Sequence, residues 1–246
     1  MCAAVALKLN HPLARVVQFQ IACLLHDLGR AGLDRRLFGK IWSWAKQHGI
    51  PTRPREWRAV HPDTRYGYEM EAFLKLYAGE LQKIGVPIGS WAREQIEMRL
   101  GYARRLMRRL RAVKPALAAL GVRWSSWMGL VMLYYYYPEK LKGASQWVRQ
   151  LAEVLVACEQ FEAYSNRRRG GDYYTRERES LVEAFEYLEK LHLEGILSVV
   201  VIDAMRSLAA EGAFDAILRE ARGTALSRSE VGYLRNMLPR GSACRS

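Results

Sequence analysis

A histidine and an aspartate stand side by side at the end of an apolar segment. His26 and Asp27 lie within the string IACLLHDLGRAGL, which begins at Ile21. Imidazole nitrogen and carboxylate oxygen are ligands for ions such as Fe, Mn and Zn. A rigid apolar helix would hold both side chains, and Gly29 would leave space above them. The alternative interpretation is a helix-capping aspartate beside a core histidine.

Two further candidate ligands lie far away along the chain. His61 follows His26 by 35 residues and precedes a proline at a break between helical segments, so it could face the same cavity. Otherwise it is a surface histidine in a turn. Glu159 and Glu162 are three residues apart and share one helical face. One of them could ligate a metal ion, whereas the alternative is a solvated acidic face.

The elements that must position these residues are helices. Apolar residues recur with a period near 3.6 along most of the chain, and alternating strand patterns are missing. The VVVI of residues 199–202 lies in a helical context. The predicted fold class is therefore all-α. The expected helices cover residues 12–28, 36–46, 56–81 with a break near 62–67, 90–113, 125–137, 145–166, 176–192, 196–210 and 214–221, with a short last helix starting at Ser227 or Ser229.

Four blocks, taken in order, resemble the HD superfamily and within it the HD-GYP phosphodiesterases of cyclic di-GMP. They are LLHDLGRAG at 24–32, the segment 56–69 around His61, YYP with LKG at 136–143, and ACEQFEAYS at 157–165. The resemblance covers roughly residues 21–208, and 41–55 and 73–123 fit poorly or are inserted. It implies an HD-domain helical bundle with a basic helical insertion that hydrolyses a phosphoester with the help of divalent metal ions.

The resemblance also implies roles for individual residues. The metal, which would be Fe, Mn, Mg or Zn, is expected at His26, Asp27, His61 and Glu159. Asp27 and Arg30 would be catalytic. The residues expected to bind substrate are Arg30, Tyr136, Tyr137 and Arg168.

The departures from the family pattern reduce the expected metal content to one ion or none. The paired histidines of the family would fall at Met128–Gly129, which offer no ligand, and Arg30 replaces a lysine. His11 is excluded because 15 residues of helix separate it from His26, about 22 Å. Two functions follow. One is a phosphohydrolase-like protein that acts on or binds a phosphoester such as a cyclic dinucleotide or nucleotide. The other is an inactive module that recruits an acidic partner.

Net charge favours acidic partners. The chain carries +13 at pH 7, with a pI near 9.8. Arginines are concentrated in the expected helix at 93–113, beside an apolar stripe. This helix is either a solvated face or a docking surface for an acidic protein, nucleic acid or anionic lipid.

The domain organisation expected is one helical domain at 1–222, with an insertion at about 73–123, and a tail at 223–246. The 4 cysteines form no C-x-x-C pair, which favours a reducing, cytoplasmic setting. The longest apolar run, at 127–137, is shorter than the roughly 20 residues that a membrane span needs. No transmembrane segment is therefore expected.

Overall fold

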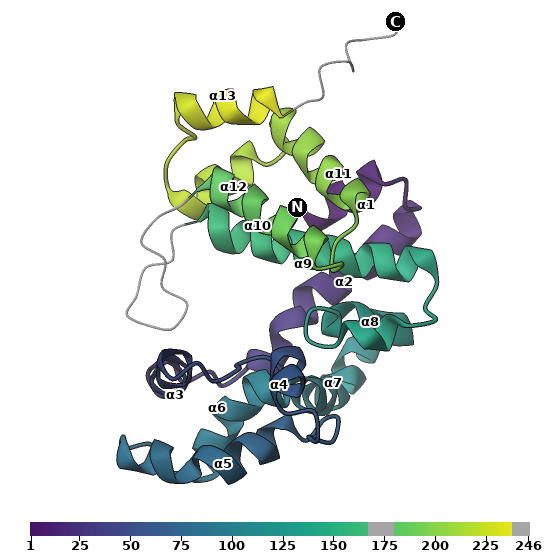
Figure 1. The fold of residues 1–246 in the computed structure, drawn as a ribbon. Coiled ribbons are helices and arrows are strands. Elements are labelled where there is room, and N and C mark those ends of the chain that lie inside the picture. The colour runs from purple at the N-terminus through teal and green to yellow at the C-terminus, as the bar shows by residue number, and fades with distance from the viewer. Residues whose placement is uncertain (167–179, 238–246) are drawn as a thin grey trace, which may run out of the picture.

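The computed structural model describes residues 1–166 and 180–237, and all regular structure in these two ranges is helical (Figure 1). The expected all-α fold class is confirmed. The helices are α1 (Cys2–Lys8), α2 (Leu13–Leu25), η1 (His26–Arg30, a 3-10 helix), α3 (Arg35–Gln47), α4 (Pro54–Val60), α5 (Glu69–Lys83), α6 (Ser90–Leu100), α7 (Tyr102–Ala119), α8 (Ser126–Leu133), η2 (Pro138–Leu141, 3-10), α9 (Gln146–Ser165), α10 (Leu181–Leu193), α11 (Val199–Ala210), α12 (Asp215–Arg222) and α13 (Arg228–Asn236).

Local capping residues explain several helix starts. Asp34 accepts a hydrogen bond from the backbone N–H of Leu37 and begins α3. Ser227 and Glu230 form a reciprocal capping box at α13, which confirms the short last helix. The VVVI segment forms the start of α11, as its helical context predicted.

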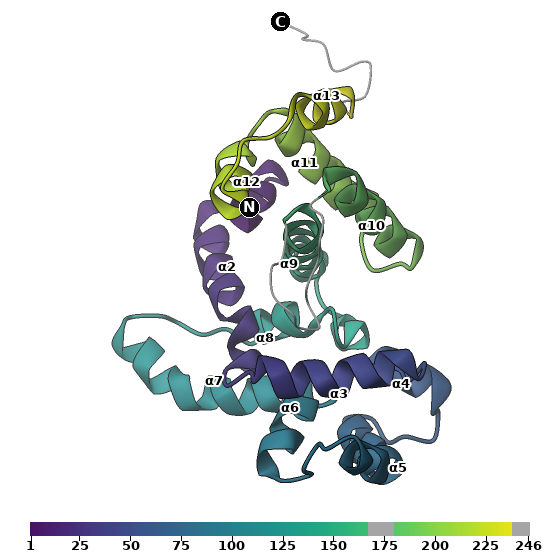
Figure 2. The same cartoon turned by 90° about the vertical axis from the view of Figure 1, so that its left-hand side faces the viewer.

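The main hydrophobic core surrounds α9. Figure 2 shows α9 nearly end-on, with α2, α8, α10 and α11 around it. Leu151, Phe161, Phe185 and Met205 are fully buried members of this core. Leu234 of α13 also belongs to it, so the last helix of the expected tail packs onto the main body.

A second core lies within α3 to α6, below the main body in Figures 1 and 2. Its buried centre contains Ile41, Trp42, Trp57 and Phe73, and its members extend from Leu33 to Leu100. The segment with a core of its own therefore begins well before the insertion expected at 73–123. Residues 41–55, which fitted the family poorly, are part of the same lobe.

The expected long helix at 90–113 is two helices. Gly101 separates α6 from α7, and a Cβ at this position would lie 2.6 Å from Glu97 Cγ. The chain can therefore bend closely at Gly101 only without a side chain. Helix α7 also runs beyond the expected end at residue 113, because it continues to Ala119 with Pro115 inside it.

In the described residues, no helix is long and apolar enough to cross a membrane. The apolar run at 127–137 is only partly helical, since α8 ends at Leu133. Cys2, Cys23 and Cys158 are free thiols. The fourth cysteine, Cys244, lies outside the described residues.

Candidate metal centre

The candidate site is built on η1, which links the two cores. The chain leaves α2 at Leu25, tightens into η1 and then enters α3, while η1 packs against α7. Gly29 is required at this contact, because a Cβ there would lie 2.5 Å from Cε2 of Tyr102. The tight turn therefore holds His26, Asp27 and Arg30 at a defined place between the lobes.

Two hydrogen bonds orient His26. Its Nδ1 lies 2.5 Å from the backbone oxygen of Cys23. A carbonyl oxygen only accepts, so Nδ1 carries a proton in this hydrogen bond and Nε2 is left to face the site. The hydroxyl of Tyr102 donates to the backbone oxygen of His26. Burial, together with the nearby Tyr136 and Asp27, holds the pKa of Tyr102 well above its ordinary value, so this hydroxyl keeps its proton.

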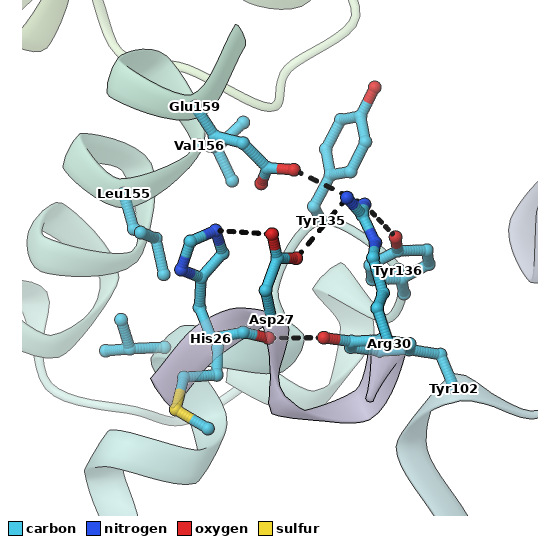
Figure 3. Close-up of a pocket in the computed structure, with 11 residues that line it drawn as sticks. His26, Asp27, Arg30, Tyr102, Tyr135, Tyr136, Leu155, Val156 and Glu159 are labelled. Atoms are coloured by element: carbon cyan, nitrogen blue, oxygen red, sulfur yellow. Dashed lines mark hydrogen bonds and ion pairs between the residues drawn. The ribbon is translucent and has the colours of Figure 1, made fainter. Parts of the chain in front are cut away.

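Three potential ligands converge here. One ligand atom from each of His26, Asp27 and Glu159 lies within 4.8 Å of the others. Glu159 comes from α9, more than 130 residues further along the chain, and its side chain points toward the pair on η1 (Figure 3). Helix α9 also presents Leu155 and Val156 to the same hollow. The central helix of the main core thus supplies both a carboxylate and an apolar wall.

The donor set suits a divalent cation. Nε2 of His26 lies 3.8 Å from Oδ2 of Asp27, so two hydrogen-bond acceptors face each other when the ring is neutral. A positive charge between them, either a proton on Nε2 or a metal ion, stabilises this arrangement. The backbone partner at Nδ1 is the kind of support that metal-ligating histidines commonly have.

Arg30 joins both carboxylates. Its Nη1 lies 3.3 Å from Asp27 Oδ1, and its Nη2 lies 3.6 Å from Glu159 Oε1. Nη2 also donates to the hydroxyl of Tyr136 at 3.0 Å. Two carboxylates and one guanidinium leave one net negative charge, which still attracts a cation.

The space at the centre of the site is small. The hollow has a volume of about 10 Å³, enough for about one water molecule or one bare ion. Tyr102 and Tyr136 stack with their ring centroids 4.4 Å apart and close one side. Val131 and Met132 of α8 also line the hollow. A ligand larger than a water molecule would therefore approach from the exposed side, where half of the Asp27 side chain is accessible.

His61 does not join this set. It lies at the C-terminal end of α4 and stacks on Trp57, with ring centroids 4.2 Å apart. Among the described residues, His61 neither lines the hollow nor belongs to the group of ligand atoms formed by His26, Asp27 and Glu159. The expected four-residue ligand set is therefore reduced to three, because packing on Trp57 holds the imidazole in the second lobe.

The residues expected to bind substrate do not all lie in the site either. Tyr136 lies in the site, whereas the neighbouring Tyr137 is buried elsewhere, against Tyr66. The guanidinium of Arg58 lies over the rings of Tyr66 and Tyr137. Arg168 lies outside the described residues. His11 stays outside the site as expected, although it lies between α1 and α2 and not on α2 as predicted.

Two residues that support the site were not anticipated from the sequence. Tyr102 underlies η1, and Arg105 is completely buried beneath it. Arg105 donates to the backbone oxygens of Gly29 and Ala31, at 2.7 Å each. A sequence signal does exist, because Tyr102, Leu106 and Leu110 form a helical stripe that includes the position of Arg105.

The burial of Arg105 corrects the expectation that the arginines of this segment lie mainly on the surface. Arg104, Arg108 and Arg109 are at least partly exposed, and each is within ion-pair distance of a glutamate. Their partners are Glu71, Glu97 and Glu94. Nearby carboxylates thus offset part of the positive charge that the sequence places here.

Comparisons of the chain with protein-family models, with curated proteins and with solved structures found no match.

Proposed function

We propose that this chain is a metal-dependent phosphohydrolase of the HD type, with one divalent ion at His26, Asp27 and Glu159. The observation that carries the proposal is the convergence of these three side chains, from two segments remote in sequence, with Nε2 of His26 facing the carboxylate of Asp27. A cyclic dinucleotide or another nucleotide is the proposed substrate class, on the basis of the HD-GYP-like blocks.

Each residue has a chemical task in this proposal. A bound ion would act as a Lewis acid toward water and phosphoryl oxygen. Arg30 offers a planar guanidinium to a phosphoryl oxygen, and Tyr136 orients that guanidinium through its hydroxyl. Tyr102 keeps His26 in place, and Leu155 and Val156 limit water access from the side of α9.

Metal content and turnover test the proposal together. The purified protein is incubated with Mn²⁺, Fe²⁺, Zn²⁺ or Mg²⁺, dialysed and measured by mass spectrometry, and then assayed on bis(p-nitrophenyl) phosphate and cyclic di-GMP. We expect about one ion per chain and slow hydrolysis, because the residues at Met128–Gly129 supply no ligands for a second ion.

Asp27→Asn is the decisive variant, and Asp63→Asn is its matched control on an exposed turn outside the site. We expect Asp27→Asn to lose the ion and the turnover, and Asp63→Asn to retain both. Equal turnover by wild type and Asp27→Asn would contradict the proposal. Fast hydrolysis of cyclic di-GMP would show that the site has more ligands than the three described here.

A second candidate is a non-catalytic binding module. The observation that favours it is Arg30, whose guanidinium already lies within ion-pair distance of both Asp27 and Glu159 and offsets one of their two negative charges. In that case the three side chains form a metal-free ion-pair network. A protein that takes up less than about a tenth of an equivalent of every metal tested, and hydrolyses neither substrate, would favour this candidate.

A further inference from the structure

A second, larger recess lies on the other side of Tyr135 and Tyr136, which also line the candidate metal centre. It consists of two adjoining hollows of about 280 Å³ and 460 Å³, which share Arg53, Glu56, Tyr187 and Lys190. These volumes are in the range of small-molecule sites. We call this recess the interlobe groove, because α10 belongs to the main core and residues 50–57 contribute to the second core.

The interlobe groove is positively charged. Five cationic side chains and two carboxylates line it, which leaves an excess of three positive charges. The cations are Lys46, Arg53, Arg55, Arg99 and Lys190, and the carboxylates are Glu56 and Glu194. Arg53 is 3.4 Å from Glu56, while Arg55 and Lys190 are exposed side chains at the rim. Such a lining attracts an anion.

Aromatic side chains form the inner wall. Tyr135 and Tyr187 approach through their hydroxyls at 3.2 Å, and the guanidinium of Arg53 lies 4.9 Å from the ring centre of Tyr135. Burial raises the pKa of Tyr135, so its hydroxyl remains a hydrogen-bond donor. Tyr187 stacks on Tyr164 on one side, and Arg53 lies over Tyr135, so a flat ring system would contact the parts of Tyr135 and Tyr187 that line the groove, including their hydroxyl groups.

Tyr135 and Tyr136 line both the interlobe groove and the small hollow at His26. Figure 3 shows the Tyr135 ring beside Arg30, with its hydroxyl directed away from His26 and Asp27. The two sites are therefore neighbours with a tyrosine wall between them. A ligand can occupy the groove without any contact to the metal ligands.

We propose that the interlobe groove binds a nucleoside monophosphate, at a site separate from the metal centre. Arg53, Arg55 and Lys190 contact the phosphate, and the base lies against Tyr135 and Tyr187. Binding requires neither a metal ion nor an intact Asp27. The proposal therefore holds or fails independently of the phosphohydrolase proposal.

Isothermal titration calorimetry in EDTA tests this inference with AMP, GMP, ribose 5-phosphate and inorganic phosphate. We expect saturable binding of at least one nucleotide, at least about tenfold tighter than ribose 5-phosphate, because the sugar phosphate has no base to contact the tyrosines. Affinity should fall as salt concentration rises. Failure of both nucleotides to bind, or equal affinity for nucleotide and ribose 5-phosphate, would overturn the proposal.

Substitutions inside and outside the interlobe groove test where the nucleotide binds. Lys190→Gln and Arg53→Gln should each weaken nucleotide binding by about tenfold, because each removes a charge-assisted contact to phosphate. Lys190 is exposed, so its substitution leaves the core intact. Lys75→Gln, an exposed lysine on α5 outside the groove, and Asp27→Asn should bind as wild type. Unchanged affinity in Lys190→Gln would place the nucleotide elsewhere and overturn the assignment.

Discussion

Arg30 lies between the carboxylates that the proposed metal ion would need. In the Arg30→Gln variant we expect tighter metal binding, by at least about tenfold, because a unit charge about 4 Å away repels a divalent cation by about 2 kcal/mol even at the dielectric constant of water. Turnover should nevertheless fall, because the phosphoryl oxygen loses its guanidinium partner. Titration with Mn²⁺ and hydrolysis of bis(p-nitrophenyl) phosphate measure the two effects separately.

The same variant separates the two functional candidates. If the three side chains form only a metal-free ion-pair network, removal of Arg30 takes away one cation that both Asp27 and Glu159 share. The melting temperature should then fall and no metal should bind. Weaker metal binding in Arg30→Gln would contradict the view that Arg30 and the ion compete for the same carboxylates. Arg30→Lys, which keeps the charge, is the matched control.

At the scale of elements, α7 holds η1 in place through a buried arginine. Arg105→Gln removes the two hydrogen bonds to Gly29 and Ala31 and the ion pairs to Glu94 and Glu97. We expect the free energy of unfolding to fall by about 3 kcal/mol, because Glu97 is nearly buried and loses a counter-charge. Urea unfolding measures this loss. Arg104→Gln, on the exposed face of the same helix, should change stability by less than about 1 kcal/mol.

The contact between η1 and α7 also depends on a glycine. Gly29→Ala should cost about 1–3 kcal/mol, because the new Cβ overlaps the Tyr102 ring and must displace it. Gly79→Ala is a control of opposite sign, since Gly79 is helical, exposed and surrounded by open space. It should stabilise the protein by up to about 1 kcal/mol. A Gly29→Ala protein as stable as wild type would mean that η1 does not pack on Tyr102 as described.

At the scale of the whole molecule, the two cores share no buried residue within the ranges 1–166 and 180–237. Ile41→Ala in the second core and Leu151→Ala in the main core should each cost about 2–5 kcal/mol locally. Hydrogen exchange should then rise in α3 to α6 for Ile41→Ala and in α9 and α10 for Leu151→Ala. Equal exchange in α9 for both variants would show that the lobes unfold as a single unit.

The candidate metal centre and the interlobe groove both lie where these lobes meet. Residues 50–57 and α10 face each other across the groove, and η1 connects α2 to α3 beside it. Residues at such a junction come from both lobes, so a small change in lobe packing alters several side chains together.

The sequence by itself determined the helical class and most helix positions, because periodicity, proline and capping residues act within a few positions of the chain. It also singled out His26 and Asp27 as candidate ligands at the end of an apolar helix, whereas the choice of Glu159 over Glu162 came from the resemblance of the block at 157–165. The tertiary structure alone decided which remote segments meet. His61 stands before a proline at a break between helices, yet its ring packs on Trp57, and Arg105 belongs to an arginine-rich segment, yet it is buried under η1. Both outcomes depend on how helices from distant parts of the chain pack together. The apolar stripe of Tyr102, Leu106 and Leu110 indicates that this face of the helix is buried, but it does not say which segment covers Arg105.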